Sequence, residues 1–351
     1  MVARVSLRNF RSYPELELAL VPGVVLVTGP NGVGKTNLLE ALHVGAQGFS
    51  PRTRAEPRLV RFGESAARVR LHGAEHGAPF ETQVDVESAA PKRIRLNGAL
   101  LGSGDELRFR LAALAFTPDR LAVVKGGPLV RRTYFDRMLG RLFPARADLP
   151  STYARALAQR NAALRQARAG EATLEAVGPW TEQVAIFGDG LDRARAELVR
   201  LLDARFHAHG EALGLEAPAL DYEEHGLAVA DLAQRLERDL QRGATGVGPH
   251  LRDVLIASAG RDLRAYGSQG EQRTAVLALV LAEADLLAER RGEAPLLLLD
   301  DVFSELDQAR GTALVSRLPP GGQTLVTATD RPAAVEPDLV IEVKLGEARA
   351  A

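Results

Sequence analysis

The pattern Gly-x-x-x-x-Gly-Lys-Ser/Thr is matched in full by Gly29-Pro30-Asn31-Gly32-Val33-Gly34-Lys35-Thr36. The match directly follows the apolar run Val24–Thr28, which is typical of a buried strand, and it precedes the helical pattern of residues 37–43. Glycines here let successive backbone N–H groups curl around phosphate oxygens, and the start of a helix adds partial positive charge. A glycine turn alone leaves Lys35 and Thr36 unexplained. The sequence therefore predicts a nucleotide-binding loop in which Lys35 reaches the β- and γ-phosphates and Thr36 binds Mg²⁺.

A second apolar run, Leu296–Leu299, ends in the paired carboxylates Asp300 and Asp301. Because a buried parallel strand presents its carboxyl end at the phosphate site, we expect Asp300 to join Thr36 at the magnesium ion. Asp301 is then placed to orient or deprotonate the attacking water. Lys35 and Asp301 are our predicted catalytic residues. The alternative is a solvated pair of acids at a strand end.

A third motif, Tyr266–Arg273, precedes a long apolar helical pattern over Thr274–Leu287. Ser268 and Gly270 can present a hydroxyl and backbone N–H groups at the start of that helix, which makes a second anion-binding device. A simple helix cap followed by a glycine turn is the alternative. The order of the motifs favours the functional interpretation, because the nucleotide-binding loop comes early and Asp300 follows this motif by a few tens of residues.

This order of motifs resembles that of the ATP-binding-cassette ATPases. Ser268–Gln272 looks like their signature motif, Asp300-Asp301 like the Walker B pair, and Ser304–Asp307 like the D-loop. The opening Leu7–Tyr13 is similar to the first strand of the SMC-type branch, in which an arginine, here Arg11, approaches the nucleotide. Within that branch the chain resembles the RecF family of recombination mediators over nearly its whole length. Further stretches that carry the likeness are Phe116–Asp119, Lys125–Pro128, Arg131-Arg132, Asp136, Gly248–His250 and Thr327–Asp330.

The expected fold class is α/β. Strand-like patterns lie at both ends of the chain, and residues 128–243 have helical spacing that glycine and proline interrupt, as at Gly210. The resemblance implies a P-loop ATPase head, built from a mixed sheet and an antiparallel β part, that comprises residues 1–124 and 245–351. The Walker A motif lies in the first part, and the signature and Walker B motifs lie in the second. A mostly helical lobe of short helices, residues 125–244, is inserted between them.

The resemblance also assigns site residues. The predicted ATP-binding residues are Arg11, Gly29, Pro30, Asn31, Gly32, Val33, Gly34, Lys35, Thr36 and Asn37. The signature residues predicted to serve a partner's nucleotide are Ser268, Gln269, Gly270, Glu271 and Gln272. The D-loop residues are Ser304 and Asp307, the switch residue is Thr329, and the Mg²⁺ ligands are Thr36 and Asp300. The predicted DNA contacts are Arg52, Arg54, Lys125, Arg131 and Arg132.

Three departures from the family pattern bear on the chemistry. The Phe116–Asp119 loop has no glutamine, so the residue that completes the magnesium shell is left open. No histidine stands at the switch position near Thr329, which excludes a mechanism that depends on a switch histidine. At position 301 most cassette ATPases have glutamate, and the shorter Asp301 predicts slow turnover.

The resemblance implies an ATP-dependent DNA-binding protein of recombinational repair, replication maintenance and the SOS response. The signature is expected far from its own nucleotide-binding loop, so a second chain must supply it, and two ATP molecules would join a head-to-tail homodimer. The dimer is expected to clamp double-stranded DNA beside single-strand gaps and to help load RecA with RecO and RecR. Weak, DNA-stimulated ATP hydrolysis would reset it.

The composition excludes several kinds of site and indicates the class of protein. The 351 residues contain no cysteine, which excludes disulfides, thiolate metal sites and cysteine nucleophiles. The formal net charge is −1, yet residues 51–170 carry a net charge of +11 and residues 171–351 one of −13, which suggests a polyanion-binding surface. No apolar run is long enough for a membrane span, and the first residues lack a signal peptide, so we expect a cytoplasmic protein. The alternatives are the ATPase subunit of a membrane transporter and an SMC-like structural protein.

Overall fold

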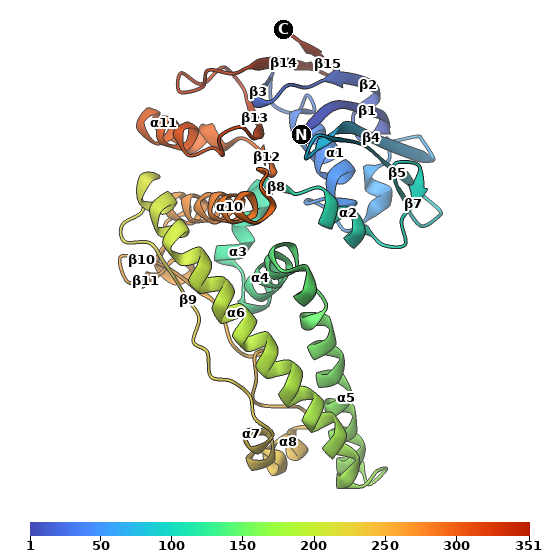
Figure 1. Ribbon diagram of the computed structural model, residues 1–351, viewed down its shortest axis with the longest axis vertical. Coiled ribbons are helices and arrows are strands. Elements are labelled where there is room, and N and C mark those ends of the chain that lie inside the picture. The colour runs from blue at the N-terminus through green and yellow to red at the C-terminus, as the bar shows by residue number, and fades with distance from the viewer. The chain divides into compact units, whose positions relative to one another are not determined.

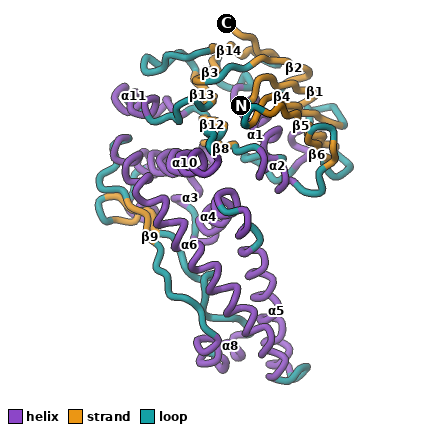
Figure 2. The backbone as a smooth tube through the Cα atoms, viewed as in Figure 1, coloured by secondary structure: helices purple, strands orange, loops and turns teal.

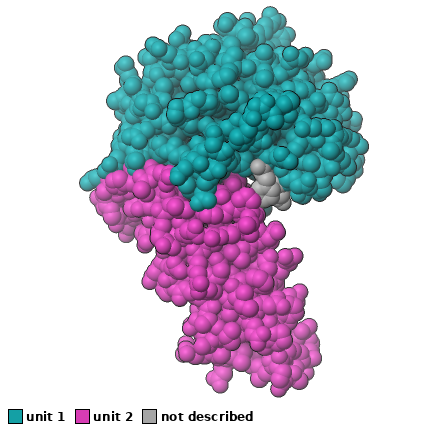
Figure 3. Space-filling model, viewed as in Figure 1, with its two compact units in different colours: residues 1–121, 208–216, 268–351 teal, residues 122–207, 217–267 magenta. Residues whose placement is uncertain are grey.

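The computed structural model describes all residues from Met1 to Ala351, apart from the side chains of Asp105 and Phe109. The chain folds into two compact units, which Figure 3 colours separately. The first unit comprises residues 1–121, 208–216 and 268–351, and the second comprises residues 122–207 and 217–267.

These bounds differ in three places from the expected inserted lobe of residues 125–244, and the first is that the second unit begins at residue 122. Residues 245–267 fold with the second unit, because strand β10 (Leu255–Ser258) pairs with β9 (Ala219–Asp221) of that unit. The short segment 208–216 folds with the first unit.

Two six-stranded sheets form the first unit (Figure 1). All neighbours in one sheet are antiparallel, and its order is β2 (Tyr13–Ala19), β1 (Val2–Phe10), β4 (Ala66–Glu75), β5 (Ala78–Glu87), β6 (Arg93–Leu96) and β7 (Ala99–Leu100). The other sheet is parallel except at β15, and its order is β15 (Glu347–Ala350), β14 (Leu339–Lys344), β3 (Gly23–Thr28), β13 (Gln323–Ala328), β12 (Leu296–Leu299) and β8 (Ala113–Phe116).

Helix α1 (Lys35–Gln47) joins the cores of these two sheets. Its buried Leu38 and Leu42 belong to one apolar cluster with side chains from both sheets, such as Val69 and Leu298. At Gly45 a Cβ would lie 2.6 Å from the side chain of Leu71 on β4, so glycine lets the helix approach that strand closely. The remaining elements of the first unit are α2 (Gly104–Arg110), α10 (Gln269–Arg291), α11 (Gln308–Ser316) and the 3₁₀ turns η1 (Glu56–Leu59), η2 (Pro118–Leu121) and η5 (Val302–Glu305).

The second unit is mostly helical, as the purple segments of Figure 2 show. Its helices are α3 (Ala122–Lys125), α4 (Pro128–Leu142), α5 (Leu149–Ala169), most of α6 (Gly178–Ala212), α7 (Val229–Gln234), α8 (Leu236–Arg242) and α9 (Leu263–Tyr266). Two 3₁₀ turns, η3 (Pro144–Arg146) and η4 (Leu174–Val177), connect them, and β9, β10 and β11 (Arg261–Asp262) form a small antiparallel sheet.

The predicted fold class is confirmed, with a mixed sheet, an antiparallel β part and an inserted helical region. One helix of that region is longer than expected: α6 has 35 residues and continues through Gly210, where we predicted a break. No helix of the described chain is long and apolar enough to cross a membrane.

Candidate functional site

The nucleotide-binding loop connects β3 to α1. Gly29, Gly32 and Gly34 all have positive φ, at 142°, 81° and 120°. A Cβ at Gly29 would lie 2.4 Å from the carbonyl oxygen of Val343, and one at Gly34 would lie 2.7 Å from Oγ of Ser12. Both positions require glycine, for lack of space as well as for backbone conformation. Helix α1 has neither a side-chain cap nor an acidic residue in its first turn, so the N–H groups of that turn are left for an anion.

The ammonium group of Lys35 lies across this loop. Its Nζ donates to the carbonyl oxygen of Gly29 at 2.5 Å and to that of Pro30 at 2.9 Å. Burial lowers the pKa of Lys35, and nearby carboxylates oppose that shift. Those carboxylates, in decreasing order of effect, are Asp301, Asp300 and Asp330. The cation and the acids that we assigned to one site are therefore close in space, and Asp330 joins them.

The two predicted magnesium ligands meet at the end of β12. Oγ1 of Thr36 donates to Oδ1 of Asp300 at 2.9 Å, and Oγ1 of Thr327 donates to the same oxygen at 2.8 Å. Burial raises the pKa of Asp300, while both threonine hydrogen bonds oppose the rise. A hydroxyl and a carboxylate beside a phosphate-binding loop are hard oxygen donors, and Mg²⁺ commonly binds one or two such groups together with phosphate and water. The residues present therefore fit a magnesium ion that nucleotide phosphates share.

No larger metal cage accompanies this pair. Among the side chains that the structure describes, no group of three or more histidine, cysteine, aspartate or glutamate residues could hold a metal ion. A magnesium ion at Thr36 and Asp300 would therefore take its remaining ligands from phosphate and water.

Asp301 has an unusual backbone for a residue with a side chain. Its φ of 50° and ψ of 39° lie in the left-handed region, and its side chain is exposed. The N–H group donates to Oγ1 of Thr327 at 2.8 Å, and the carbonyl oxygen accepts from Oγ of Ser304 at 3.0 Å and from Arg273. The neighbours thus fix the main chain of Asp301 and leave its carboxylate free to act.

The predicted signature motif forms the start of α10. Oγ of Ser268 accepts from the N–H of Glu271 at 3.2 Å, and Oε2 of Glu271 accepts from the N–H of Ser268 at 2.8 Å. This reciprocal cap is the structural alternative considered above, and it also holds Gln269 and Gly270 exposed on the first turn. The remaining signature residue, Gln272, is buried.

The predicted D-loop and switch residues follow the same edge of the parallel sheet. Asp307 caps α11, because its Oδ1 accepts from the N–H of Arg310 at 2.8 Å. Thr329 is exposed directly after β13, and Asp330 follows it.

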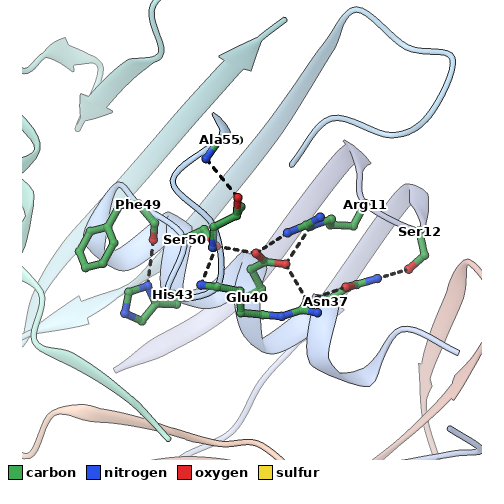
Figure 4. Close-up of polar contacts among 10 residues, drawn as sticks. Arg11, Ser12, Asn37, Glu40, His43, Phe49, Ser50 and Ala55 are labelled. Atoms are coloured by element: carbon green, nitrogen blue, oxygen red, sulfur yellow. Dashed lines mark hydrogen bonds and ion pairs between the residues drawn. The ribbon is translucent and has the colours of Figure 1, made fainter. Parts of the chain in front are cut away.

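Arg11, the predicted nucleotide contact of the first strand, is engaged with helix α1 (Figure 4). Its guanidinium donates to both carboxylate oxygens of Glu40, at 2.9 and 2.8 Å, and the Glu40 side chain is fully buried. Ser50 and Arg52 also donate to that carboxylate, at 2.5 and 3.1 Å. In the same close-up, Nδ2 of Asn37 donates to Oγ of Ser12 at 3.0 Å. Arg11 therefore supports the helix that carries the loop, and its approach to the nucleotide stays a prediction.

Arg52 was predicted as a DNA contact, and the structure places it beside the nucleotide site. Its Nη1 donates to Oδ1 of Asn37 at 3.2 Å and to Glu40, and its positive charge acts to lower the pKa of Asp300. Arg52 is exposed at this place, and its contact with DNA stays a prediction.

Arg131 is a correction to the predicted DNA contacts. Its side chain is buried, and its Nε donates to Asp253 at 2.9 Å while Nη2 donates to the other oxygen of that carboxylate. Nη1 donates to the carbonyl oxygens of Val124 and Gly126, at 3.0 and 3.3 Å. Such a guanidinium has no access to a DNA phosphate, so Arg131 holds the segment before β10 against α4.

The other predicted DNA contacts are more accessible. Arg132 is half-buried and donates to the carbonyl oxygen of Arg252 at 2.8 Å, whereas Arg54 and Lys125 are exposed. Arg52, Arg54 and Lys125 are therefore the predicted contacts that are exposed to solvent.

Three site residues were missed by the sequence analysis: Thr327, Glu40 and Asp330. Thr327 and Asp330 lie in the quoted stretch Thr327–Asp330, where the end of a buried strand was the available signal. No signal in the sequence pointed to Glu40, because an acid within a helical pattern is ordinarily a solvated residue.

Comparison with known proteins places the chain in one family over its whole length. The family model described as RecF/RecN/SMC N terminal domain matches residues 1–350. The DNA replication and repair protein RecF of Symbiobacterium thermophilum is 38% identical over 346 residues, which cover 94% of this chain and 91% of that protein. The protein of the same name from Anaeromyxobacter dehalogenans is 39% identical over 364 residues, which cover 97% of this chain and 96% of that protein.

Solved structures agree with these relatives. A structure of the recombination mediator protein RecF with ATP, described as part of the RecFOR pathway, matches with a TM-score of 0.88 and 28% identity over 100% of this chain and 97% of that one. An SMC head domain from Pyrococcus furiosus matches with a TM-score of 0.60 and 16% identity, over 100% of this chain and 95% of that one, which shows a shared fold.

Proposed function

Because the chain belongs to the RecF family of SMC-type ATPases, we propose that it is an ATP-driven clamp of recombinational DNA repair. It is an ATPase of DNA replication and repair, as its family is. The finer proposal is a homodimer that closes on double-stranded DNA beside single-strand gaps and helps RecO and RecR to load RecA. Hydrolysis that is slow and stimulated by DNA would open the clamp.

One observation carries the nucleotide part of this proposal. Thr36 and Asp300 are hydrogen-bonded at 2.9 Å although 264 residues separate them in the chain, and both lie beside the glycine loop. Lys35 adds a cation at the same place. The loop would hold the phosphates, Lys35 would contact the β- and γ-phosphates, and Thr36 with Asp300 would hold Mg²⁺. Mg²⁺, when bound, would neutralise charge that develops on the phosphates.

The hydrolytic step would depend on Asp301. Its exposed carboxylate stands on a fixed backbone, next to Asp300 and close enough to Lys35 to oppose the burial that lowers the pKa of that lysine. Asp301 would orient the attacking water and accept its proton. Since catalysis here consists of positioning and charge stabilisation, a short aspartate is expected to give low turnover.

The dimer part of the proposal rests on the exposed start of α10. Ser268, Gln269 and Gly270 lie on the surface, and the backbone N–H groups of Gln269 and Gly270 in the first helical turn suit the phosphates of a second chain's nucleotide. The DNA contacts are expected to be mainly to phosphates, from exposed cations such as Arg54 and Lys125.

Light scattering tests the dimer directly. The Asp301→Asn variant should bind ATP without hydrolysing it and should then have the mass of two chains, whereas the nucleotide-free protein should have the mass of one. Monomers of Asp301→Asn at saturating ATP and Mg²⁺ would rule out the clamp.

A further inference from the structure

Asp301 has a backbone conformation that needs support. At φ 50° and ψ 39° it lies in the left-handed region, which is unfavourable for any residue with a Cβ. Such a conformation persists where the surrounding structure fixes it, and this commonly happens at functional sites.

One buried hydroxyl supplies the support on the amino side. Oγ1 of Thr327 accepts from the N–H of Asp301 at 2.8 Å and donates to Oδ1 of Asp300 at 2.8 Å. The Thr327 side chain is fully buried on β13, so its hydroxyl cannot turn to water. A hydroxyl has one hydrogen to donate. Thr327 donates that hydrogen to Asp300, and its oxygen accepts from Asp301, so one hydroxyl binds both residues of the Walker B pair.

The carbonyl side of Asp301 is held independently. Its oxygen accepts from Oγ of Ser304 at 3.0 Å and from Nη2 of Arg273, and Nη1 of Arg273 also donates to Glu305 at 2.8 Å. Both peptide groups that flank Asp301 are therefore anchored, although its carboxylate forms no hydrogen bond with any group that the structure describes.

We propose that Thr327 is a positioning residue for Asp301. By holding the N–H of Asp301 and the carboxylate of Asp300 together, it fixes the point from which the Asp301 carboxylate reaches the attacking water. The inference rests on the proposed function, in which Asp301 orients that water. It assigns to Thr327 a role in hydrolysis that is separate from nucleotide binding, because Thr36 still holds Asp300 when the Thr327 hydroxyl is removed.

The matched variants are Thr327→Val, which keeps the side-chain shape without the hydroxyl, and Thr327→Ser, which keeps the hydroxyl. In Thr327→Val, kcat for ATP hydrolysis should fall by about 10- to 100-fold, because a small displacement of a catalytic group is costly. KM and the Kd for ATP should change by less than about threefold, because the binding contacts remain. Thr327→Ser should restore kcat.

Amide hydrogen exchange gives a second result without nucleotide. The Asp301 amide should exchange slowly in the unmodified protein and in Thr327→Ser, and faster in Thr327→Val. Rapid exchange of this amide in the unmodified protein would overturn the proposal, even if Thr327→Val failed to fold.

Asp301→Asn, assayed in parallel, distinguishes a failure of the proposed function of Asp301 from a failure of the proposed role of Thr327. If Asp301→Asn hydrolyses ATP normally, the proposed function of Asp301 is wrong. If Asp301→Asn is slow while folded Thr327→Val keeps the normal kcat, the role of Asp301 stands and the positioning role of Thr327 is wrong.

Discussion

Oγ1 of Thr36 and Oδ1 of Asp300 lie 2.9 Å apart at the point where α1 begins and β12 ends. The parallel pairing of β3, β13 and β12 aligns the carboxyl ends of these strands, so the glycine loop after β3 meets the acid after β12. This contact joins the first and last parts of the chain at one site.

Asp300→Asn should keep the fold and lose hydrolysis. An amide oxygen can still accept from Thr36 and Thr327, whereas the negative charge that attracts Mg²⁺ is gone. We expect the Mg²⁺-dependent kcat to fall by about 10²- to 10³-fold, the loss typical of one electrostatic catalytic group. Steady-state ATPase assays measure it, with the exposed Asp148→Asn as the control. Normal turnover in Asp300→Asn would refute the assignment of Asp300 to magnesium.

Gly34→Ala should damage the nucleotide-binding loop more than Gly32→Ala. Both residues have positive φ, but a Cβ at Gly34 meets Oγ of Ser12 at 2.7 Å, whereas one at Gly32 has nothing within 4 Å. Gly32→Ala is expected to cost roughly 1 kcal/mol of stability from backbone strain, and Gly34→Ala more. Thermal unfolding and ATP titration measure the two effects. Equal losses in both variants would contradict the steric explanation.

Much of the ATPase unit could be predicted from the sequence because its signals are local. The glycine loop, the apolar run that ends in Asp300 and the capped start of α10 each lie within a few residues. The burial of Arg131 could not be predicted in this way, because its partner Asp253 is 122 residues away and a pair of arginines in a basic stretch suggests a solvated surface. The alternating strand β4 and the short strands β8, β14 and β15 were also missed, because no motif drew attention to them.

Arg131→Met should destabilise the helical unit without affecting DNA binding. The change removes a buried cation and leaves Asp253, whose side chain is 29% exposed, without its main partner. We expect a loss of roughly 1–3 kcal/mol in the free energy of unfolding, the usual effect of removing a charged hydrogen-bond partner. Denaturant unfolding measures this loss, and the exposed Lys125→Met is the control. A stable Arg131→Met protein that binds DNA weakly would restore Arg131 as a DNA contact.

The stability of the helical unit should fall at mildly acidic pH because of His250. Burial is the main cause that lowers its pKa from the ordinary value of about 6.5, and the positive charges of Arg132 and Arg195 act in the same direction. The hydrogen bond to the carbonyl of Thr245 and the carboxylate of Asp239 oppose the shift. Nδ1 lies 2.6 Å from the hydroxyl of Tyr153 and Nε2 lies 3.1 Å from Thr245 O, which suits a neutral ring.

The sign of the effect follows from proton binding. Below about pH 6.5 the unfolded chain binds a proton at position 250 that the folded chain resists, so the stability present above that pH is progressively lost as the pH falls. Unfolding curves between about pH 7.5 and pH 5 should show this loss, and His250→Gln should show a shallower one. His225→Gln, at a half-exposed position, should behave as the unmodified protein does. The same slope in all three proteins would contradict the role of His250.

The most direct test of the clamp is DNA binding with and without ATP, for the unmodified protein and for Lys35→Met. The measurement is the Kd for a gapped duplex at fixed salt concentration, since phosphate contacts make any such affinity salt-dependent. ATP should tighten binding by the unmodified protein and should have no effect on Lys35→Met, which lacks the cation of the nucleotide site. The same Kd in all four conditions would show that nucleotide binding at Lys35 does not control the grip on DNA.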